Sequence, residues 1–322
     1  MNIAEGGMLI METIKRTRIA IIGLGGIARK VYLPLLTAHP QVEIVGIMNR
    51  SPEPVKEIGQ AHRIERGTTD LKELLSWDLD AVFVHTATES HFEIVMACLE
   101  KGLAVYVDKP LSYTLRESEE MTAFAEAQGL LLAVGFNRRF APMYLKAKEW
   151  MQGGKGYETL TLTKHRTGLQ DRPAAETIYD DLIHMLDLML WYADNDVQLV
   201  HQWLRRDDQD RLLHAAGTAK QGKTALARFE MIRAAGADLE KVEMHGGGRS
   251  VEVVNMDTAY YAEQGELDTK ETFGSWDTVL ARRGFAGAVD HFLACLDTPD
   301  DCQISASYVM DSHELAEKLI TG

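Results

Sequence analysis

Two patterns of apolar and polar residues divide the chain. In the first part, short runs of mostly apolar residues occupy positions 17–23, 42–48, 80–86, 103–107 and 130–135. Helical segments at 92–101 and 115–128 separate the later runs. Strands that alternate with helices are typical of a parallel sheet with both faces covered. We therefore predict a doubly wound α/β domain over residues 17–136.

The second part has a different periodicity. After a helix at residues 144–154, apolar and polar residues alternate at 158–165, 197–203, 224–231, 241–245 and 250–256. This alternation is typical of a sheet with one covered and one exposed face. Two helices, at 285–296 and 305–321, end the chain, and we expect at least one to pack back on the first domain. Residues 137–322 are thus predicted to form a second domain.

The first apolar run leads into a glycine motif. Residues 23–28 read Gly-Leu-Gly-Gly-Ile-Ala, which is Gly-x-Gly-x-x-Ala at a strand-to-helix junction. Gly23 permits a tight turn, Gly25 lets the backbone approach a pyrophosphate, and Ala28 lets the helix pack close to the strand. The N–H groups of the following helix favour phosphates. The motif predicts a dinucleotide site, the alternative being a glycine-rich turn without a ligand.

The end of the second strand bears on the choice of cofactor. An NAD-specific site places an acidic residue there to bind the ribose 2′-hydroxyl. This chain has Asn49, Arg50 and Ser51 and no acid. Arg50 can pair with a 2′-phosphate, and its neighbours can donate hydrogen bonds to it. We therefore favour NADP(H); in the alternative, NAD(H) binds and Arg50 is a solvated loop arginine.

Further ligand contacts are expected at the carboxyl ends of the strands, where ligands of doubly wound sheets bind. Thr86, Lys109 and Asn137 lie at such ends. The complete set of expected cofactor-binding residues is Gly23, Gly25, Gly26, Ile27, Ala28, Asn49, Arg50, Ser51, Thr86, Thr88, His91, Asp108 and Asn137.

An apolar helix over residues 179–187 carries three carboxylates and one imidazole. Asp180 lies four residues before His184 and Asp187 three residues after it, so a helix places all three on one side. A carboxylate beside an imidazole orients the ring and stabilises its protonated form, which suits a general base near neutral pH. Asp181 can take the place of Asp180 in this arrangement. The alternative is a core histidine satisfied by its neighbours.

Composition narrows the class of protein. The chain has 322 residues, 46% of them hydrophobic and 25% charged, as in a soluble globular protein of two domains. No apolar run approaches the ~18 residues of a membrane span, and no signal peptide is evident. The net charge of 34 − 48 = −14 disfavours nucleic acids and anionic membranes as partners. We expect residues 1–16 to be a flexible extension.

Cysteine usage points to a reducing compartment. Three cysteines without a Cys-x-x-Cys pair argue against a disulfide framework or a zinc site and favour the cytoplasm. We therefore expect no metal.

Several motifs in order resemble one family of enzymes. Residues 23–28, Asp-Lys-Pro at 108–110, residues 135–140 and residues 180–187 resemble the Gfo/Idh/MocA oxidoreductases, from about residue 17 to the C-terminus. Asp-Lys-Pro replaces the usual Glu-Lys-Pro of that family and keeps its lysine. Similarity to the MviM-type branch rests on residues 81–85, 107–111, 135–142, 164–166 and 283–285.

The resemblance implies an architecture and a reaction. The second domain is expected to be α+β with an open, mostly antiparallel sheet, whose exposed face often forms homo-oligomers, here a dimer or tetramer. The expected reaction is hydride transfer between the nicotinamide and a sugar- or polyol-like hydroxyl or carbonyl. Lys109, often followed by a cis proline, stabilises the substrate oxygen. His184 exchanges the proton, Asp180 holds the ring or shares the proton, and Asp187 supports them.

The expected catalytic residues are therefore Lys109, Asp180 and His184, and the expected substrate contacts are Lys109, Arg138, Arg166 and His184. We further expect one residue among Lys164, His165, Arg166 and Arg172 to bind an anionic substituent, and Arg283 is a candidate cofactor contact. Two alternatives share this scaffold: a non-catalytic nucleotide-dependent sensor, and a glycosidase that uses NAD for transient oxidation.

Overall fold

A parallel sheet forms the N-terminal domain. The computed structural model describes residues 16–222 and 225–322, so the predicted extension lies, but for Arg16, outside the described residues. The six strands are all parallel, in the order β3-β2-β1-β4-β5-β6. Their bounds are β1 Thr17–Ile22, β2 Val42–Met48, β3 Gly67–Thr68, β4 Ala81–Val84, β5 Ala104–Val107 and β6 Leu132–Val134. The strand order reverses between β1 and β4, which opens the crevice where such sheets bind dinucleotides.

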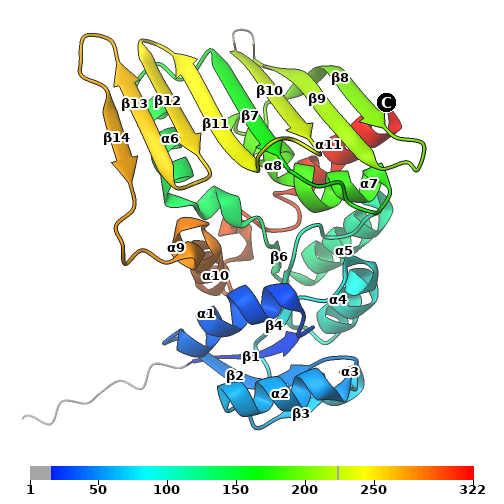
Figure 1. Ribbon diagram of the computed structural model, residues 1–322. Coiled ribbons are helices and arrows are strands. Elements are labelled where there is room, and N and C mark those ends of the chain that lie inside the picture. Colours follow the sequence, from blue (N-terminus) through cyan, green and yellow to red (C-terminus); the bar gives the residue numbers. More distant parts are fainter. Residues whose placement is uncertain (1–15, 223–224) are drawn as a thin grey trace, which may run out of the picture.

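Helices cover this sheet (Figure 1). They are η1 Ala28–Tyr32, α1 Leu33–Ala38, α2 Pro52–His62, α3 Leu71–Leu74, η2 Thr88–Ser90, α4 His91–Glu100 and α5 Leu115–Gln128. One helix from the C-terminal part, α10 (Phe285–Ala294), also packs on the sheet, because the Phe292 ring lies 5.3 Å from that of Phe83 and 5.5 Å from that of Tyr106.

A larger sheet forms the second domain. Its order is β14-β13-β12-β11-β7-β10-β9-β8, and all neighbours are antiparallel except β7 and β10. The strands are β7 Thr159–His165, β8 Gln198–Arg206, β9 Leu212–Gln221, β10 Ala225–Ile232, β11 Leu239–Gly246, β12 Arg249–Val254, β13 Thr258–Glu263 and β14 Thr269–Thr272. This confirms the predicted fold class, a parallel domain followed by an open, mostly antiparallel one.

The helices of the second domain lie between its sheet and the N-terminal domain and leave the other face of the sheet open (Figure 1). They are η3 Asn137–Phe140, α6 Pro142–Gln152, α7 Ala174–Thr177, η4 Ile178–Leu182, α8 Ile183–Tyr192, α9 Val279–Arg282, η5 Pro299–Asp301 and α11 Met310–Thr321. Every residue of α8 is buried, as its apolar composition requires.

The sequence did not predict the helices α2, α3, α7 and α9 or the strands β3, β9, β13 and β14. In β9 the reason is visible: its centre is built from alanine and glycine rather than from β-branched residues. A Cβ on Gly217 would lie 2.4 Å from the Phe229 ring, so a small residue is needed there. The predicted strand at 224–231 matches β10, apart from Thr224, which lies outside the described residues.

The last helix begins at Met310 rather than near residue 305. The segment before it runs along β6: the Val134 N–H donates to the Ile304 carbonyl at 2.8 Å, and the Ala306 N–H donates to the Leu132 carbonyl at 2.7 Å. The backbone of 304–306 is thus committed to the first sheet and is not helical.

A buried ion pair ties three separate segments together. Asp187 in α8 accepts hydrogen bonds from Arg139 in η3, at 2.7–3.2 Å, and from the Ser312 hydroxyl in α11 at 3.0 Å. Arg139 also donates to the Gln303 carbonyl at 2.8 Å. The two charged side chains are 0% and 1% exposed. Asp187 therefore serves packing between helices and does not support His184 as expected.

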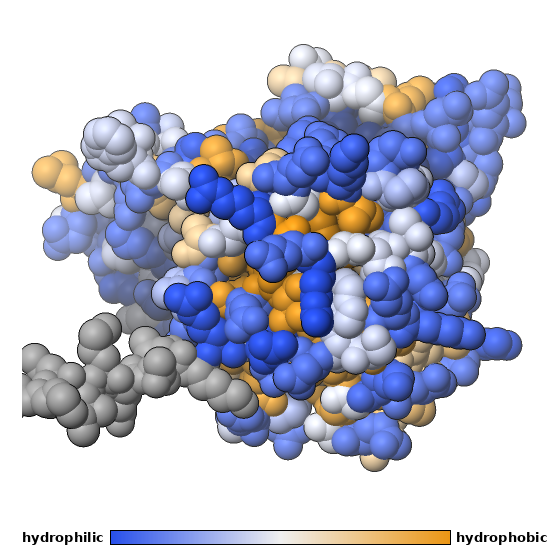
Figure 2. Space-filling view, turned by 90° about the horizontal axis from the view of Figure 1, so that it is seen from below, coloured by the Kyte–Doolittle hydropathy of each residue, from blue (hydrophilic) through white to orange (hydrophobic). Residues whose placement is uncertain are grey.

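The surface of the N-terminal end is mostly hydrophilic. Seen from that end, it shows small apolar areas near its centre that are framed by polar side chains (Figure 2). Among residues 16–222 and 225–322, no helix has the length and apolar character needed to cross a lipid bilayer.

Replacing Arg139 with methionine is expected to lower the free energy of unfolding by about 3–5 kcal/mol, because Asp187 would remain buried without its cation. Urea unfolding followed by circular dichroism measures the change. Arg205→Met, at an exposed position on β8, is the control and should change it by less than about 1 kcal/mol. Equal midpoints for both variants would contradict this role of the ion pair.

Candidate active site

The glycine turn after β1 presents open backbone at the carboxyl edge of the sheet. Gly23 has φ +91°, and a Cβ there would lie 2.6 Å from the backbone of His85 and Thr86. A Cβ on Gly25 or Gly26 would meet no other atom within 4 Å. The Leu24 N–H donates to Asn49 Oδ1 at 3.1 Å, which fixes the turn against the end of β2. A dinucleotide pyrophosphate fits this bare backbone.

The loop after β2 leaves one cation exposed. Asn49 is held by the glycine turn, and its Nδ2 lies 3.4 Å from the Ser51 carbonyl. Arg50 and Ser51 are exposed, and Arg50 forms no hydrogen bond or ion pair with the described residues. By contrast, Arg29 in η1 is paired with Glu57 at 2.8 Å. Arg50 is therefore available to a ligand at the tip of β2.

Three residues that we expected to bind cofactor are committed to the protein. His91 is 1% exposed, and its ring nitrogens lie 3.1–3.3 Å from the carbonyls of Pro110, Leu111 and Thr86. Burial lowers the pKa of His91. The ring thus supports the turn that carries Lys109, whose peptide bond to Pro110 is cis.

Asp108 and Asn137 are likewise held by neighbours. Asp108 accepts a hydrogen bond from the Tyr32 hydroxyl at 3.1 Å and pairs with His85 Nδ1 at 3.0 Å. Asn137 is 3% exposed and donates to the Arg283 carbonyl at 2.7 Å.

Two threonines at this edge, Thr86 and Thr88, are only partly exposed. Thr86 Oγ1 is buried and has no hydrogen-bond partner within the described residues, so it is a polar group that a bound ligand could satisfy. The residues predicted to bind cofactor therefore fall into two groups: those whose side chains are held by the protein itself, and a smaller group that remains available to a ligand.

Residues 178–182 form a π-helical turn just before α8. A π turn bonds residue i to i+5 and shifts the spacing of side chains. The expected pairing of Asp180 with His184 does not form: the Asp180 carboxylate accepts a hydrogen bond from the Tyr113 hydroxyl at 2.9 Å and pairs with Arg172. Asp181 does not replace it, because it pairs with Lys164 at 2.6 Å and with Arg233 at 2.5 Å.

Two lysines bind the backbone carbonyls of this turn. Lys109, from the first domain, donates to the carbonyl of Asp180, and Lys164, from β7, donates to the carbonyl of Asp181 at 2.9 Å. The contact of Lys109 crosses from one domain to the other. It holds the ammonium near His184, whose pKa it helps to lower.

His184 stands among cations instead of beside a carboxylate. Its Nδ1 is buried and has no hydrogen-bond partner within the part of the chain that the structure describes. Burial lowers the pKa of His184 well below its ordinary value, and the charges of Arg138, Lys164, Lys109 and Arg166 lower it further. The ring is therefore neutral near pH 7 and can accept a proton.

Burial acts on both lysines as well. It lowers the pKa of Lys109 to about 8 and that of Lys164 to about 7. Both lysines can therefore change charge close to neutral pH, and a bound ligand that shifts either pKa would change that charge.

Sequence reasoning missed Tyr113, Arg233 and Glu240. Tyr113 orients Asp180, Arg233 pairs with Asp181, and Glu240 accepts from Arg138 at 2.5 and 3.0 Å. No motif marks these residues, since each comes from a different element and meets the site only in the folded chain. Arg138, which we expected to contact substrate, is committed to Glu240.

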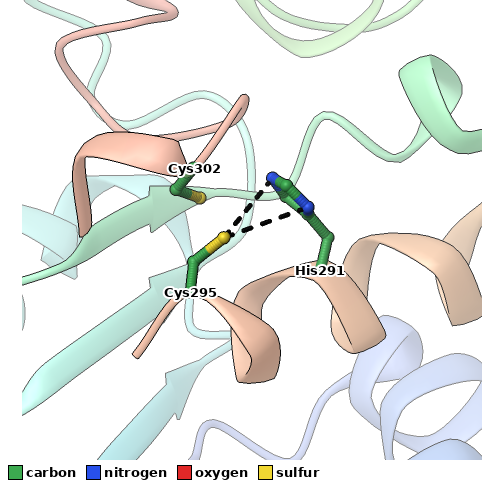
Figure 3. Close-up of side chains that lie close together, drawn as sticks. All are labelled: His291, Cys295 and Cys302. Atoms are coloured by element: carbon green, nitrogen blue, oxygen red, sulfur yellow. Dashed lines mark hydrogen bonds between the residues drawn. The ribbon is translucent and has the colours of Figure 1, made fainter. Parts of the chain in front are cut away.

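Another group of reactive side chains belongs to α10 and the loop after it (Figure 3). The donor atoms of His291, Cys295 and Cys302 lie within 4.8 Å of one another. However, His291 Nε2 accepts the Gln303 N–H at 2.9 Å. A metal-bound imidazole normally donates its second N–H to an acceptor. Because this ring already accepts a backbone N–H, we assign no metal to the group.

The fold and the site together define a class of protein. A dinucleotide crevice that opens beside a lysine and a neutral imidazole is typical of nicotinamide-dependent oxidoreductases. A family model described as "Oxidoreductase family, NAD-binding Rossmann fold" matches residues 17–136, and one described as "YceM-like, C-terminal domain" matches residues 142–264. The chain belongs to the Gfo/Idh/MocA family of oxidoreductases and is an NAD(P)-binding enzyme.

Individual relatives agree with this assignment. The protein of Salmonella typhimurium that is named "Putative oxidoreductase YceM" is 34% identical over 88% of this chain and 90% of its own. The crystal structure of the dehydrogenase MviM from Clostridium difficile has a TM-score of 0.89 and 32% identity, and the match covers 95% of this chain and 99% of that one. Inositol 2-dehydrogenase of Acidothermus cellulolyticus is 30% identical over 59% of this chain and 57% of its own.

The variant Lys164→Met is expected to raise the pKa of His184, because it removes one of the positive charges that disfavour the imidazolium. Titration of the histidine side-chain signals by NMR measures the shift, and His184→Gln assigns the resonance. The control is Lys146→Met, because Lys146 lies on α6 in an exposed pair with Glu271 of β14. It should leave the pKa of His184 unchanged. An unchanged value in Lys164→Met would contradict the electrostatic account.

Proposed function

We propose that this enzyme transfers a hydride between NADP(H) and a sugar- or polyol-like substrate, at a carbon that alternates between hydroxyl and carbonyl. One observation carries the proposal: Lys109, which follows the carboxyl end of β5, donates to the Asp180 carbonyl in the π turn just before His184. A relative named as an inositol dehydrogenase supports the choice of a polyol-like substrate.

The proposed chemistry assigns a task to each side chain. When bound, the nicotinamide supplies the hydride acceptor or donor. In oxidation, neutral His184 accepts the hydroxyl proton while the carbon loses its hydride, and the C–O bond becomes a carbonyl. The Lys109 ammonium donates a hydrogen bond to that oxygen and stabilises its developing negative charge. Reduction runs in reverse, with protonated His184 as the acid.

Asp180 supports this chemistry in a different way from the one its spacing indicated. Its backbone carbonyl binds Lys109, and its carboxylate orients Tyr113 and Arg172 at the same edge. We therefore propose Asp180 as a positioning residue for Lys109 and Arg172.

Two further proposals concern the setting of the enzyme. We propose a homo-oligomer that buries the open face of the second sheet, because Trp203 and Val200 on β8 are each 55% exposed. Sedimentation velocity decides this, and a monomer would overturn it. We place the enzyme in the cytoplasm, since its three cysteines carry no pairing motif.

The two alternatives make distinct demands. A nucleotide-dependent sensor would bind NADPH without turnover of any polyol, and substitution of Lys109 would change nothing measurable. A glycosidase with transient oxidation would co-purify with NAD and would not consume it.

The exposed Arg50 carries the preference for NADP(H). Arg50→Ala is expected to weaken NADPH binding about tenfold or more, equivalent to ~1.4 kcal/mol, because the 2′-phosphate loses its cation. NADH affinity should stay within about twofold. Fluorescence titration of cofactor-free protein measures both, and Lys56→Ala, a nearby exposed lysine in α2, is the control. If wild type binds NADH as tightly as NADPH, the preference is wrong.

Lys109 carries the proposed catalysis. Lys109→Met should lower kcat about 10²–10³-fold and leave NADPH affinity nearly unchanged, because the ammonium acts on the substrate oxygen. Since the pKa of Lys109 is lowered to about 8, the rate should fall as pH rises through this value and the ammonium is lost. The residual rate of Lys109→Arg should lack this descending limb. A limb that persists in Lys109→Arg would assign it to another group.

A further inference from the structure

Four cations share two carboxylates beside His184. We call this group the cationic cluster; it comprises Arg138, Lys164, Arg166 and Arg233 with Asp181 and Glu240. With all six groups ionised, it holds a surplus of 4 − 2 = 2 positive charges. Uncompensated charge in a mostly buried site is costly. The surplus therefore indicates that an anion belongs in the site.

Three of these cations are already committed. Lys164 lies 2.6 Å and Arg233 2.5 Å from Asp181, and Arg138 lies 2.5 Å from Glu240. Their side chains are between 1% and 9% exposed.

Arg166 differs from the other three. It lies 3.6 Å from Asp181 and 3.6 Å from Glu240, and its side chain is 23% exposed. The one hydrogen bond that its side chain makes within the described residues goes to the carbonyl of His165, at 2.9 Å. The guanidinium is therefore the cation of the cluster that is both accessible and without a tight ionic partner.

Neighbouring charges reduce the surplus without cancelling it. The Asp238 carboxylate, whose pKa is lowered by hydrogen bonds from Thr167 and also by the charges of Arg166 and Arg233, brings it to 2 − 1 = 1. Arg172 pairs with Asp180, which leaves that pair neutral. Lys109 is balanced by the adjacent Asp108, which also pairs with His85. His184 is neutral. The positive charge thus persists at the place where a substrate must lie.

We propose that the substrate carries an oxyanion group, a carboxylate or a phosphate, and that Arg166 binds it while the reacting carbon lies between Lys109 and His184. A guanidinium can donate two parallel N–H bonds to either group. The inference rests on the proposed function and gives its substrate a chemical class. It also selects Arg166 from the candidates that the sequence offered.

Anion binding should be linked to proton uptake. Burial lowers the pKa of Lys164 to about 7 and that of His184 well below its ordinary value, and the neighbouring cations lower both further. A bound anion offsets the positive field, so the pKa of each group rises toward its ordinary value. At pH 8, above this pKa, Lys164 is mostly deprotonated, so the site should take up a fraction of a proton per anion bound. A neutral sugar should cause no such uptake.

Isothermal titration calorimetry of the NADPH-saturated enzyme tests the proposal. The probes are inorganic phosphate, D-glucuronate, D-glucose 6-phosphate and D-glucose, each at pH 8 in two buffers of different ionisation enthalpy. We expect at least one anion to bind about tenfold or more tighter than D-glucose, with proton uptake. A preference for glucuronate or for the phosphates identifies the oxyanion. If every anion binds as weakly as D-glucose, the proposal is overturned.

Variants locate the site. Arg166→Gln should weaken anion binding about tenfold or more and leave NADPH binding unchanged, and Arg166→Lys should restore part of the affinity. Arg228→Gln on β10, an exposed arginine of the same sheet, is the matched control and should have no effect. Equal anion affinity in Arg166→Gln and Arg228→Gln would overturn the assignment to Arg166.

The outcomes separate this inference from the proposed function. Turnover of neutral polyols that depends on Lys109, without any preference for anions, would leave the function standing and overturn the inference. Anion binding that depends on Arg166, without hydride transfer to any polyhydroxy acid or sugar phosphate, would support the anion site and overturn the function.

Discussion

The binding of two lysines to the carbonyls of one π turn is the interaction on which the site depends. A regular α-helix bonds its carbonyls internally, so it offers none to side chains. The turn at 178–182 departs from that pattern, and Lys109 and Lys164 bind the carbonyls of Asp180 and Asp181. Because Lys109 comes from the first domain, this contact sets the position of the cofactor-binding domain relative to His184.

The electrostatics of the site follow from this arrangement. Both lysines stand close to His184, and neither neighbouring carboxylate reaches its ring. The imidazole is consequently kept neutral by burial and by positive charge. The neutral ring can accept a proton from a hydroxyl, but the same positive field weakens it as a base. An anionic substrate, as we propose, would offset this field and stabilise the imidazolium, and it would thereby couple catalysis to the charge of the substrate.

Much of the fold was readable from the sequence, because it depends on local patterns. Apolar runs predicted the parallel strands, and the glycine motif predicted the turn after β1. Alternation predicted part of the second sheet but missed β9, where alanine and glycine make room for Phe229. The small residues of β9 are explained by the Phe229 ring of the neighbouring strand β10, which the residues of β9 alone do not reveal.

The site could be predicted only in part, because many of its contacts do not depend on local sequence patterns. Lys109 and His184 lie in recognisable motifs, and Lys109 binds the turn that directly precedes the helix of His184. The pairing of Asp180 with His184 assumed α-helical spacing, which the π turn does not keep. Arg233 and Glu240 come from strands distant in sequence, so their contribution to the charge of the site depends on tertiary structure. Asp187 shared the helix of His184 but pairs with Arg139, which no spacing rule indicates.

A crystal structure of the complex with NADP⁺ would test the central claim most directly. We expect the pyrophosphate on the backbone of residues 23–28. We expect the nicotinamide C4 to face the space between Lys109 Nζ and the His184 ring, with room for one substrate carbon. A nicotinamide that points away from Lys109, or a dinucleotide bound elsewhere, would contradict the assignment of these two residues to hydride transfer.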